Sequence, residues 1–410
     1  MTDANHIWLT RKEAEGSLVA HARFAARTHM VPVEDASGRI AAKDVSALRV
    51  FPDKPASRWD GIAVRYDAFQ GAKPDFSTWR EGADYRFSNT GVCIEGDFDT
   101  VVRIEETNFS DEGALLDVVT PKERGQLVIP VGSEMGKGDV LVRKGQRITP
   151  FAAARLARGG YEQVEVIAPP RVAFVPTGNE LVDYRSELPA GKNVETNSIM
   201  VASKLQRWGA DPVVFPLLKD DPNLIAAALR SALCQADIVV LNGGSSKGAD
   251  DYAAVAIASV ADIFCHAVKM GPGAHIIMAA AEEGVPVVGL SGPAAGADMT
   301  AEFYLRALIE KYYGLAPVEP PAVRATLAAV PRSPFNRKST VTMAYRMVVW
   351  RDRAGAFFSQ PASEESSVGK IGRDGGNAYL FVEPDDNYHV GDVAQMELSW
   401  PYEYPPCCGD

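Results

Sequence analysis

The stretch Asp237-Ile238-Val239-Val240-Leu241-Asn242-Gly243-Gly244-Ser245-Ser246-Lys247-Gly248-Ala249-Asp250-Asp251 decides the fold class of this chain. Residues 237–241 form an apolar, β-branched run, which predicts a buried strand, and a glycine-rich turn follows it. Similar runs at 171–175 and 285–288 end in the turns Pro176-Thr177-Gly178-Asn179-Glu180 and Gly289-Leu290-Ser291-Gly292-Pro293. Open α/β sheets bind ligands beyond the carboxyl ends of their strands, so these turns predict one shared binding edge.

The region around this stretch alternates strand and helix patterns from residue 171 to about residue 318. Such alternation is typical of a parallel sheet with crossover helices, and it predicts a central three-layer α/β domain. Strands are expected at 172–175, 211–215, 238–241 and 285–288, and helices near 198–209, 222–232 and 297–312, with further helices outside this region at 10–30 and 149–158.

The flanking regions are richer in strand patterns than in helix patterns. At the start of the chain, Thr10 and Glu13 have the spacing of a helix capping box. Short strands separated by turns fill 63–134, which predicts a β-rich domain. The same pattern over 323–400 predicts a small C-terminal β-barrel or sandwich. We therefore expect a multidomain protein of the α/β plus β class.

The composition of the 410 residues is that of a globular protein, with 46% hydrophobic and 23% charged residues. A chain of this length predicts roughly two to four domains. The net charge of -11 argues against a nucleic-acid-binding protein, which needs a basic face. Residues 1–10 lack the apolar core of a secretory signal, and no apolar run reaches the ~18 residues of a membrane span.

Five cysteines are scattered along the chain without metal-ligand spacing, at positions 93, 234, 265, 407 and 408. That pattern predicts reduced thiols and a cytoplasmic protein. Cys407 and Cys408 are adjacent in a proline-rich end of the chain. A flexible tail and a metal or redox role are both open interpretations of this pair.

The residues of the three turns indicate the class of ligand. Glycines allow backbone amides to approach a phosphate closely. Lys247 offers a counter-charge, and Asp250 and Asp251 offer oxygen ligands for a hard cation. The first hypothesis is therefore a phosphorylated small molecule that binds together with a metal ion.

Several motifs in a fixed order give this chain a resemblance to a known family. They are Ser57-Arg58-Trp59-Asp60-Gly61, Val101-Val102-Arg103-Ile104-Glu105, Thr177-Gly178-Asn179-Glu180-Leu181, Thr196-Asn197-Ser198, Asp220-Asp221 and the turn 243–251. In this order they resemble the molybdopterin molybdenumtransferase (molybdenum insertase) family of molybdenum-cofactor biosynthesis. The resemblance covers nearly the whole chain.

The resemblance implies a homodimer of four-domain subunits, in which the inserted lobe of one subunit helps to close the site of the other. The implied parts are a discontinuous linker or oligomerisation domain at 1–49 and 139–168, an inserted β-rich lobe at 50–138, an α/β molybdopterin-binding domain at 169–318, a C-terminal β-barrel domain at 319–402 and a flexible tail at 403–410.

The reaction that the resemblance implies is transfer of molybdenum from molybdate to molybdopterin, usually in its adenylylated form, with Mg²⁺. A molybdopterin adenylyltransferase and acceptor molybdoenzymes are implied as partners. The resemblance assigns catalysis to Asp60, Glu105, Glu180 and Asp251, metal binding to Glu180, Asp220 and Asp251, and ligand binding to Thr177, Gly178, Gly243, Gly244, Ser246, Lys247, Gly248, Lys269, Ser291 and Gly292.

Six of the charged residues in this set also have a purely structural interpretation, because acids favour turns and helix starts. The structural alternatives are a turn residue for Asp60, a helix-start acid for Glu180 and Asp220, a helix cap for Asp251, a solvated strand residue for Glu105 and an exposed lysine for Lys247.

Two loops depart from the pattern of the family. Lys269-Met270-Gly271-Pro272-Gly273 carries one lysine where the family has two, and 290–296 lacks the family's asparagine and serine but gains Ser291. Losing one charge-assisted contact costs about 1.5–3 kcal/mol. A catalytically altered homologue that binds a pterin or nucleotide as a carrier or scaffold is therefore the alternative function, and a nucleotide hydrolase is a third.

Overall fold

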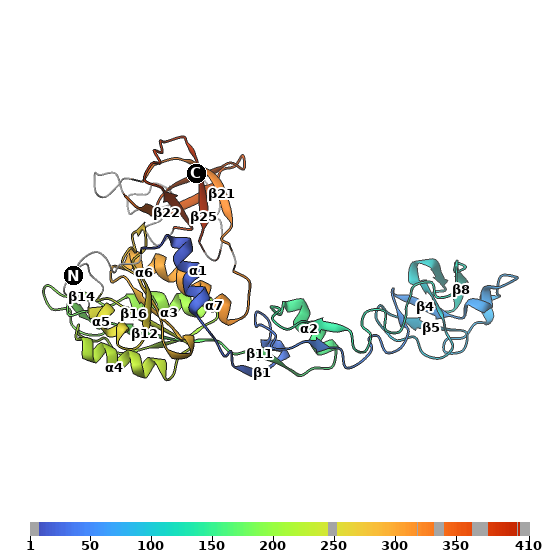
Figure 1. The fold of residues 1–410 in the computed structure, drawn as a ribbon. Coiled ribbons are helices and arrows are strands. Elements are labelled where there is room, and N and C mark those ends of the chain that lie inside the picture. The colour runs from blue at the N-terminus through green and yellow to red at the C-terminus, as the bar shows by residue number, and fades with distance from the viewer. Residues whose placement is uncertain are drawn as a thin grey trace. The chain divides into compact units, whose positions relative to one another are not determined.

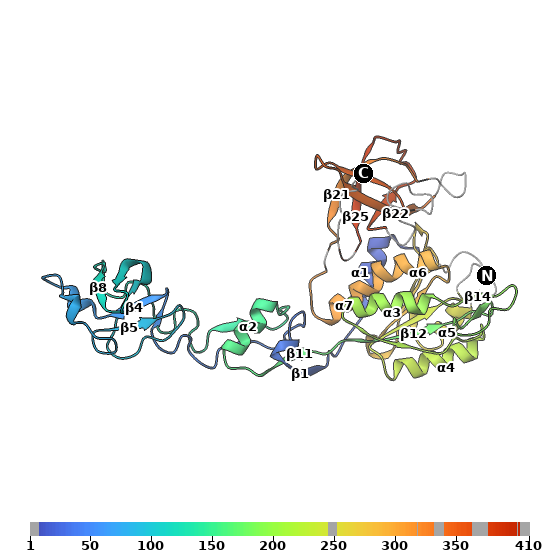
Figure 2. The same ribbon diagram turned by 180° about the vertical axis from the view of Figure 1, so that it is seen from behind.

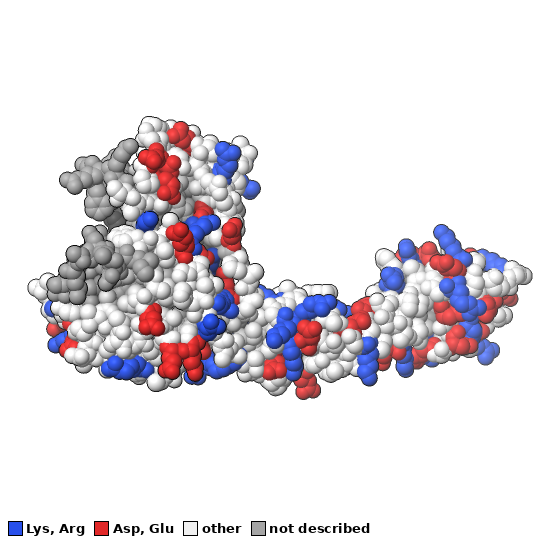
Figure 3. All heavy atoms as spheres, in the orientation of Figure 1, with Lys and Arg blue, Asp and Glu red and all other residues white. Residues whose placement is uncertain are grey.

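The computed structural model describes residues 8–244, 252–317, 319–331, 340–362, 376–399 and 401. The chain falls into two compact units, one of residues 27–168 and one that combines 1–26 with 169–410. On the face shown in Figure 3, basic and acidic side chains are interspersed on both units. Within the described residues, no helix combines the length and apolar character that crossing a membrane requires.

The larger unit contains a central sheet of six strands, in the order β15 (Asp211–Val214), β12 (Arg171–Pro176), β16 (Ile238–Asn242), β20 (Pro286–Leu290), β19 (Ile277–Ala280) and β17 (Asp262–His266). The first four strands are parallel, which confirms the four predicted strands. β19 is antiparallel to β20 and to β17, so the prediction of a purely parallel sheet is wrong at this edge. Methionine and alanine in β19 favour strands weakly, and pairing with β20 makes this segment a strand.

Helices cover both faces of this sheet and give the expected three layers (Figures 1 and 2). On one face, apolar side chains of α4 (Pro222–Leu233) and α5 (Tyr252–Ala258) share a core with alternate residues of β12 and β16. The other face carries α1 (Arg11–His21), α3 (Asn197–Arg207), α6 (Ala294–Thr300), the π-helical turn η7 (Ala301–Leu305) and α7 (Arg306–Tyr312), and the short η6 (Glu282–Gly284) joins β19 to β20.

The first helix is shorter than predicted. Thr10 and Glu13 form the expected capping box at its start, but α1 ends at His21 and not near residue 30. Residues 28–32 instead form β1 (Thr28–Pro32), which pairs antiparallel with β11 (Gln163–Ile167). Tertiary pairing therefore overrides the helical pattern in this segment. α1 packs against α7, and the segment up to Ala26 falls into the larger unit.

The C-terminal strands close into a five-stranded barrel. They are β21 (Ala322–Leu327), β22 (Thr342–Arg351), β23 (Phe357–Pro361), β24 (Ala378–Val382) and β25 (Val393–Leu398). β22 pairs with β23, β23 with β21, β21 with β25, β25 with β24, and β24 again with β22. This circuit decides between the two predicted architectures in favour of a barrel. The short β18 (Met270–Gly271) adds to it by pairing with β22.

The described residues of the unit 27–168 form three separate apolar clusters, and the unit is rich in short strands, as predicted. Thr149 caps α2 (Pro150–Arg158), which confirms the predicted helix there. The remaining elements of this unit are η2 (Val33–Asp35), β2 (Val45–Ser46), β3 (Ala56–Ser57), β4 (Gly61–Val64), η3 (Tyr66–Phe69), η4 (Phe76–Thr78), β5 (Tyr85–Ser88), β6 (Thr100–Arg103), η5 (Ile104–Glu106), β7 (Thr107–Phe109), β8 (Leu115–Val118), β9 (Val128–Ile129) and β10 (Val140–Val142).

A largely buried ion-pair network joins α3, α6 and η7 to the barrel. Lys204 Nζ lies 2.5 Å from Asp298 Oδ1 and 3.0 Å from Glu302 Oε2. Arg346 of β22 pairs with the other oxygen of Asp298, and the Tyr379 hydroxyl donates to Glu302 Oε2 at 3.3 Å. One lysine therefore serves two carboxylates that are shielded from water.

Replacing this lysine tests how much the network contributes. We expect Lys204→Met to lower the free energy of unfolding by about 3 kcal/mol, because Asp298 and Glu302 lose their shared buried cation. The control is Lys12→Met, whose amine lies 3.9 Å from Glu319 in an exposed pair and whose loss costs less than about 1 kcal/mol. Urea denaturation measures both, and equal losses in the two variants would contradict the assignment.

Candidate functional site

The three glycine-rich turns meet at one edge of the central sheet. β12, β16 and β20 are parallel neighbours, so their carboxyl ends lie side by side. β17 runs in the same direction as β20, because β19 is antiparallel to both. The loop after β17, which contains Lys269, therefore reaches the same edge. The structure thus brings four chain segments to the edge that the sequence predicted as the binding edge.

Two buried asparagines tie these turns together. Asn242, the last residue of β16, donates from Nδ2 to the carbonyl of Ser291 at 2.8 Å. Asn197, the first residue of α3, donates from Nδ2 to Asn242 Oδ1 at 2.9 Å and to the carbonyl of Gly292 at 2.8 Å. The amide and hydroxyl of Thr177 both donate to the carbonyl of Asn242. Side-chain amides therefore fix the spacing of the turns after β12, β16 and β20.

The chain at Gly243 requires glycine. Its φ of 102° lies in the region that L side chains avoid, and a Cβ there would lie 2.4 Å from the carbonyl oxygen of Thr177. The amide of Gly243 donates to Leu290, and the amide of Gly178 donates to Leu218. These two buried glycines therefore shape the edge, and their amides are already engaged. Gly244 and Gly292 lie further out, and Gly292 is exposed.

An acidic corner lies beside the first turn. The amide of Asn179 donates to Asp220 Oδ2 at 2.9 Å, and the amide of Asp220 donates back to Asn179 Oδ1 at 3.3 Å. Asp220 Oδ1 is buried and accepts no hydrogen bond from the described residues. Asp221 caps α4 instead, by accepting from the amides of Asn223 and Leu224. The helix-start interpretation therefore applies to Asp221 and not to Asp220.

Glu180 extends from the same corner and is exposed. It precedes β13 (Leu181–Val182), which pairs with β14 (Asn193–Val194), so no helix starts at Glu180 and the helix-start interpretation is wrong there. Lys192 Nζ donates to the carbonyl of Asn179 at 2.7 Å and holds this turn from the outside. Glu180 thus follows Asn179 directly in the chain, and Asp220 is hydrogen-bonded to Asn179, so both acids adjoin this residue.

One buried carboxylate near this edge was not predicted. Glu195 accepts from the amide of Ser198 at 2.9 Å and from the Ser198 hydroxyl, and it thereby fixes the start of α3. This contact positions Asn197, whose role was also not predicted. The motif Thr196-Asn197-Ser198 was the available signal for both residues, but a motif alone does not show which side chain points into the sheet edge.

The two departing loops serve structural roles at the edge. Met270 is buried, and its strand β18 pairs with the barrel strand β22. The side chain of Lys269 is exposed, and its amide donates to the carbonyl of Leu9 at 2.8 Å. Ser291 is buried against Gly296, where an added Cβ would lie 3.0 Å from the serine Oγ. The predicted binding residues Ser246, Lys247 and Gly248 and the predicted acid Asp251 lie outside the described residues.

The predicted lobe acids are both exposed in the unit of residues 27–168. Asp60 Oδ1 accepts from the amide of Thr90 at 2.6 Å and from its hydroxyl at 2.9 Å. These two donors lower the pKa of Asp60 below its usual value. The next residue, Gly61, lies so close to β6 that an added Cβ would meet the carbonyl oxygen of Val102 at 1.9 Å. Glu105 lies on η5, and the amide of its neighbour Ile104 donates to the carbonyl of Asp60.

Comparison with known proteins decides the family. A profile described as "MoeA N-terminal region (domain I and II)" matches residues 9–160, and one described as "Probable molybdopterin binding domain" matches residues 173–311. A molybdopterin molybdenumtransferase from Nostoc sp. is 31% identical over 310 residues, which are 70% of this chain and 70% of the relative. The chain belongs to the molybdopterin molybdenumtransferase family.

Other relatives extend this likeness over 94–96% of the chain. The molybdopterin molybdenumtransferase of Bacillus subtilis is 26% identical over 411 residues and covers 94% of each chain. A molybdopterin biosynthesis MoeA protein from Pyrococcus horikoshii shares the fold, with a TM-score of 0.71 and 22% identity over 96% of this chain and 100% of its own. Among the described residues of the present chain, no three His, Cys, Asp or Glu side chains are grouped closely enough to form a metal site by themselves.

The asparagine pair at the sheet edge allows a direct test. We expect Asn197→Ala to lower the free energy of unfolding by about 2 kcal/mol, because Asn242 Oδ1 and the carbonyl of Gly292 lose their buried donor. Asn223→Ala is the matched control, since Asn223 is exposed at the start of α4 and should change stability by less than about 0.5 kcal/mol. Urea denaturation provides the measurement. An Asn197→Ala variant as stable as Asn223→Ala would show that the pair does not hold the turns.

Proposed function

We propose that this chain inserts molybdenum from molybdate into molybdopterin, with the adenylylated pterin as its substrate. The observation that carries the proposal is the sheet edge, where an unpartnered oxygen of Asp220 lies beside glycine-rich turns in a member of the molybdopterin molybdenumtransferase family. Substrate phosphates and their metal ions need this combination of amide donors and carboxylate oxygens.

The pterin phosphates bind at the turns after β16 and β20. The amides of Gly178 and Gly243 already donate to backbone carbonyls at the edge. The phosphates are therefore proposed to bind to Gly244, Gly292 and the loop that continues from Gly244. Ser246, Lys247 and Gly248 of that loop are proposed as phosphate contacts from the family pattern. Thr177 acts by holding the carbonyl of Asn242, and Lys269 and Ser291 are proposed to line the edge further out.

The residues at the acidic corner fit Mg²⁺. This ion keeps several waters and binds proteins through one or two carboxylates together with substrate phosphates, so a cluster of three protein ligands is not needed. Asp220 offers its unpartnered Oδ1, and Glu180 offers an exposed carboxylate on the adjoining turn. Asp251 is proposed as a further ligand. The ion would neutralise charge on the phosphoanhydride during its cleavage, and the task of the protein residues is to position the ion and the phosphates.

Two acids of the β-rich lobe complete the proposed site. We assign Asp60 and Glu105 to the site of a second subunit, in a cytoplasmic homodimer that receives its substrate from a molybdopterin adenylyltransferase and passes its product to acceptor molybdoenzymes. The amide and hydroxyl of Thr90 keep Asp60 ionised and fix its carboxylate in one orientation. That fixed orientation suits a residue that must face a ligand held by another chain.

The central experiment follows adenylylated molybdopterin during a single turnover. With Mg²⁺ present, adding molybdate should release AMP and yield molybdenum-loaded pterin, whereas omitting molybdate should leave the substrate intact. Calorimetry with the same pterin measures binding separately. Binding without molybdate-dependent cleavage would overturn the transferase assignment and would leave the carrier or scaffold as the function.

A pair of glutamate variants tests the acidic corner. Glu180→Gln should slow molybdate-dependent AMP release roughly 10- to 100-fold, the equivalent of losing one charge-assisted contact. Glu187→Gln is the control, because Glu187 is also exposed and lies on the loop between β13 and β14, and its rate should stay within about twofold of the unmodified protein. Equal rates for the two variants would remove Glu180 from the site.

A further inference from the structure

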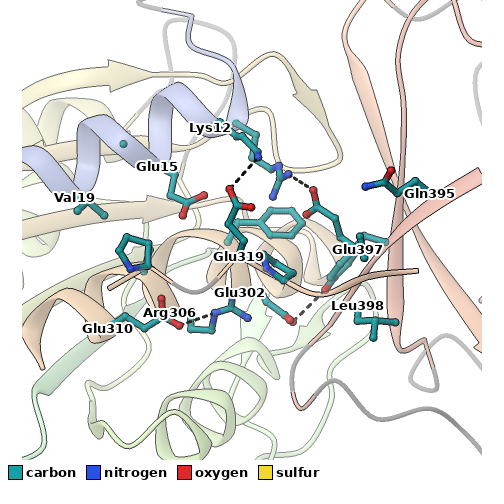
Figure 4. A pocket seen from close by; sticks show the side chains of 18 residues that line it. Lys12, Glu15, Val19, Glu302, Arg306, Glu310, Glu319, Gln395, Glu397 and Leu398 are labelled. Carbon is teal, nitrogen blue, oxygen red and sulfur yellow. Dashed lines mark hydrogen bonds and ion pairs between the residues drawn. The ribbon is translucent and has the colours of Figure 1, made fainter. Parts of the chain in front are cut away.

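One cavity of the larger unit is lined by charges that pair with one another. It has a volume of about 350 Å³ and lies between α1, the η7–α7 segment and the barrel strands β24 and β25 (Figure 4). Arg11 donates to Glu397 Oε1 at 2.7 Å, and Arg306 lies 3.4 Å from Glu310. Both arginines of this wall therefore already have acidic partners, and neither is left for a ligand.

The β-rich lobe carries arginines without such partners. The guanidinium groups of Arg58 and Arg103 form no hydrogen bond or ion pair with the described residues. Other arginines of this unit are paired with carboxylates, namely Arg65 with Asp97, Arg86 with Glu95, and Arg124 with Asp67 and Asp99. Arg58 begins the turn between β3 and β4, and Arg103, the last residue of β6, pairs with the first residue of β4. The two unpaired cations therefore lie at the same end of this sheet.

Three neighbouring side chains of the turn between β3 and β4 are exposed. They are Arg58, Trp59 and Asp60, whereas Ser57 and Gly61 on either side are buried. Trp59 is 47% exposed, although tryptophan is highly buried on average. Its large ring and polar N–H make tryptophan a frequent contact residue at interfaces. An exposed tryptophan next to an unpaired arginine is therefore a candidate for contact with a ligand.

The backbone of this turn is held from several sides. The Ser57 hydroxyl donates to the carbonyl of Trp59 at 2.6 Å, and the amide of Arg58 donates to the carbonyl of Leu127 at 2.9 Å. The carbonyl of Asp60 accepts from an amide of η5 at 3.0 Å. Because the turn is already ordered, a ligand that binds its side chains loses little free energy in ordering the backbone.

Arg103 fixes the orientation of the Trp59 ring. Its guanidinium carbon lies 4.7 Å from the ring centroid, which is the geometry of a cation–π contact. Nearly half of the Trp59 surface remains exposed, so the indole keeps room for a second ring to stack. Planar nitrogen-containing rings stack on such aromatic side chains, and guanidinium groups bind phosphate oxygens. The turn therefore suits a ligand that combines a planar ring with phosphate groups.

We propose that Trp59 determines specificity in the proposed reaction, by stacking on a fused ring of the phosphorylated substrate while Arg58 contacts its phosphate oxygens. The inference rests on the proposed function, because the adenylylated pterin combines two fused rings with phosphates. Arg103 is a positioning residue, since it acts through the indole. Asp60 follows Trp59 directly, so the stacked ring adjoins an acid already assigned to the site.

Two probes test the stacking on the full chain by calorimetry. 5′-AMP presents the adenine ring, and molybdopterin presents the pterin ring. We expect Trp59→Ala to weaken binding of at least one probe about tenfold, as loss of one stacked ring does, and Trp59→Phe to restore most of that affinity. The affected probe identifies the ring. Unchanged affinity for both probes in Trp59→Ala, or no binding of either probe by the unmodified chain, would overturn the proposal.

Matched variants test the location. Tyr66→Ala removes another ring of the same unit that also has an arginine over it, Arg124 at 5.7 Å, and its affinity should stay within about twofold of the unmodified chain. Arg58→Gln should weaken 5′-AMP binding about tenfold, and Arg80→Gln is its control because Arg80 is also exposed. Equal losses in Tyr66→Ala and Trp59→Ala, or in the two arginine variants, would contradict the assignment.

This test fails separately from the test of the transferase. Molybdate-dependent AMP release together with unchanged binding by Trp59→Ala would remove only Trp59 from the site. Weakened probe binding by Trp59→Ala without any molybdate-dependent release would keep the ring contact and remove the transferase assignment.

Discussion

The hydrogen bonds of Asn242 hold together the part of the molecule on which its chemistry depends. Three parallel strands end at the same edge, but strand pairing stops at their last residues and does not fix the turns beyond them. Asn242 connects these turns through its hydrogen bonds. Its carbonyl accepts from Thr177, its side-chain oxygen accepts from Asn197, and its side-chain amide donates to the carbonyl of Ser291. Buried amide groups of this kind are stable only when every donor and acceptor is matched. A fixed edge is therefore a consequence of a fully satisfied network.

A second network of largely buried polar groups connects two parts of the larger unit. Lys204, Asp298, Glu302 and Arg346 join the helical layer to the barrel through charges that are mostly shielded from water. The loop after β17 makes a further connection, since β18 pairs with β22 of the barrel. This loop, which departs from the family pattern, is thus also a structural connection. Its buried Met270 is explained by packing in this connection.

The sequence was a good guide where the signal was local and strong. The runs at 171–175 and 238–241 were recognised as strands because apolar β-branched residues there are followed by glycine turns, and the structure confirms them. β19 was missed because methionine and alanine give no such signal. The first three residues of β1 were assigned to a helix, because the pairing of β1 with β11 involves residues more than 130 positions away. Local patterns do not contain long-range pairing.

The same limit applies to the site. Asp220 was singled out from the pair Asp220-Asp221, but only the fold shows that Asp221 caps α4 while Asp220 turns to Asn179. Gly178 and Gly243 were assigned to the ligand, whereas their amides are engaged within the edge. Residue type indicates what a side chain is able to do. Which of its groups remain available depends on neighbours brought in by tertiary structure.

The antiparallel pairing of β1 with β11 sets Thr28 opposite Ile167. The chain therefore enters the unit of residues 27–168 through β1 and leaves it through β11, and these two strands pair with each other. The length of the chain between β1 and β11 is able to change without altering the register of the central sheet, because no strand of that sheet lies between them.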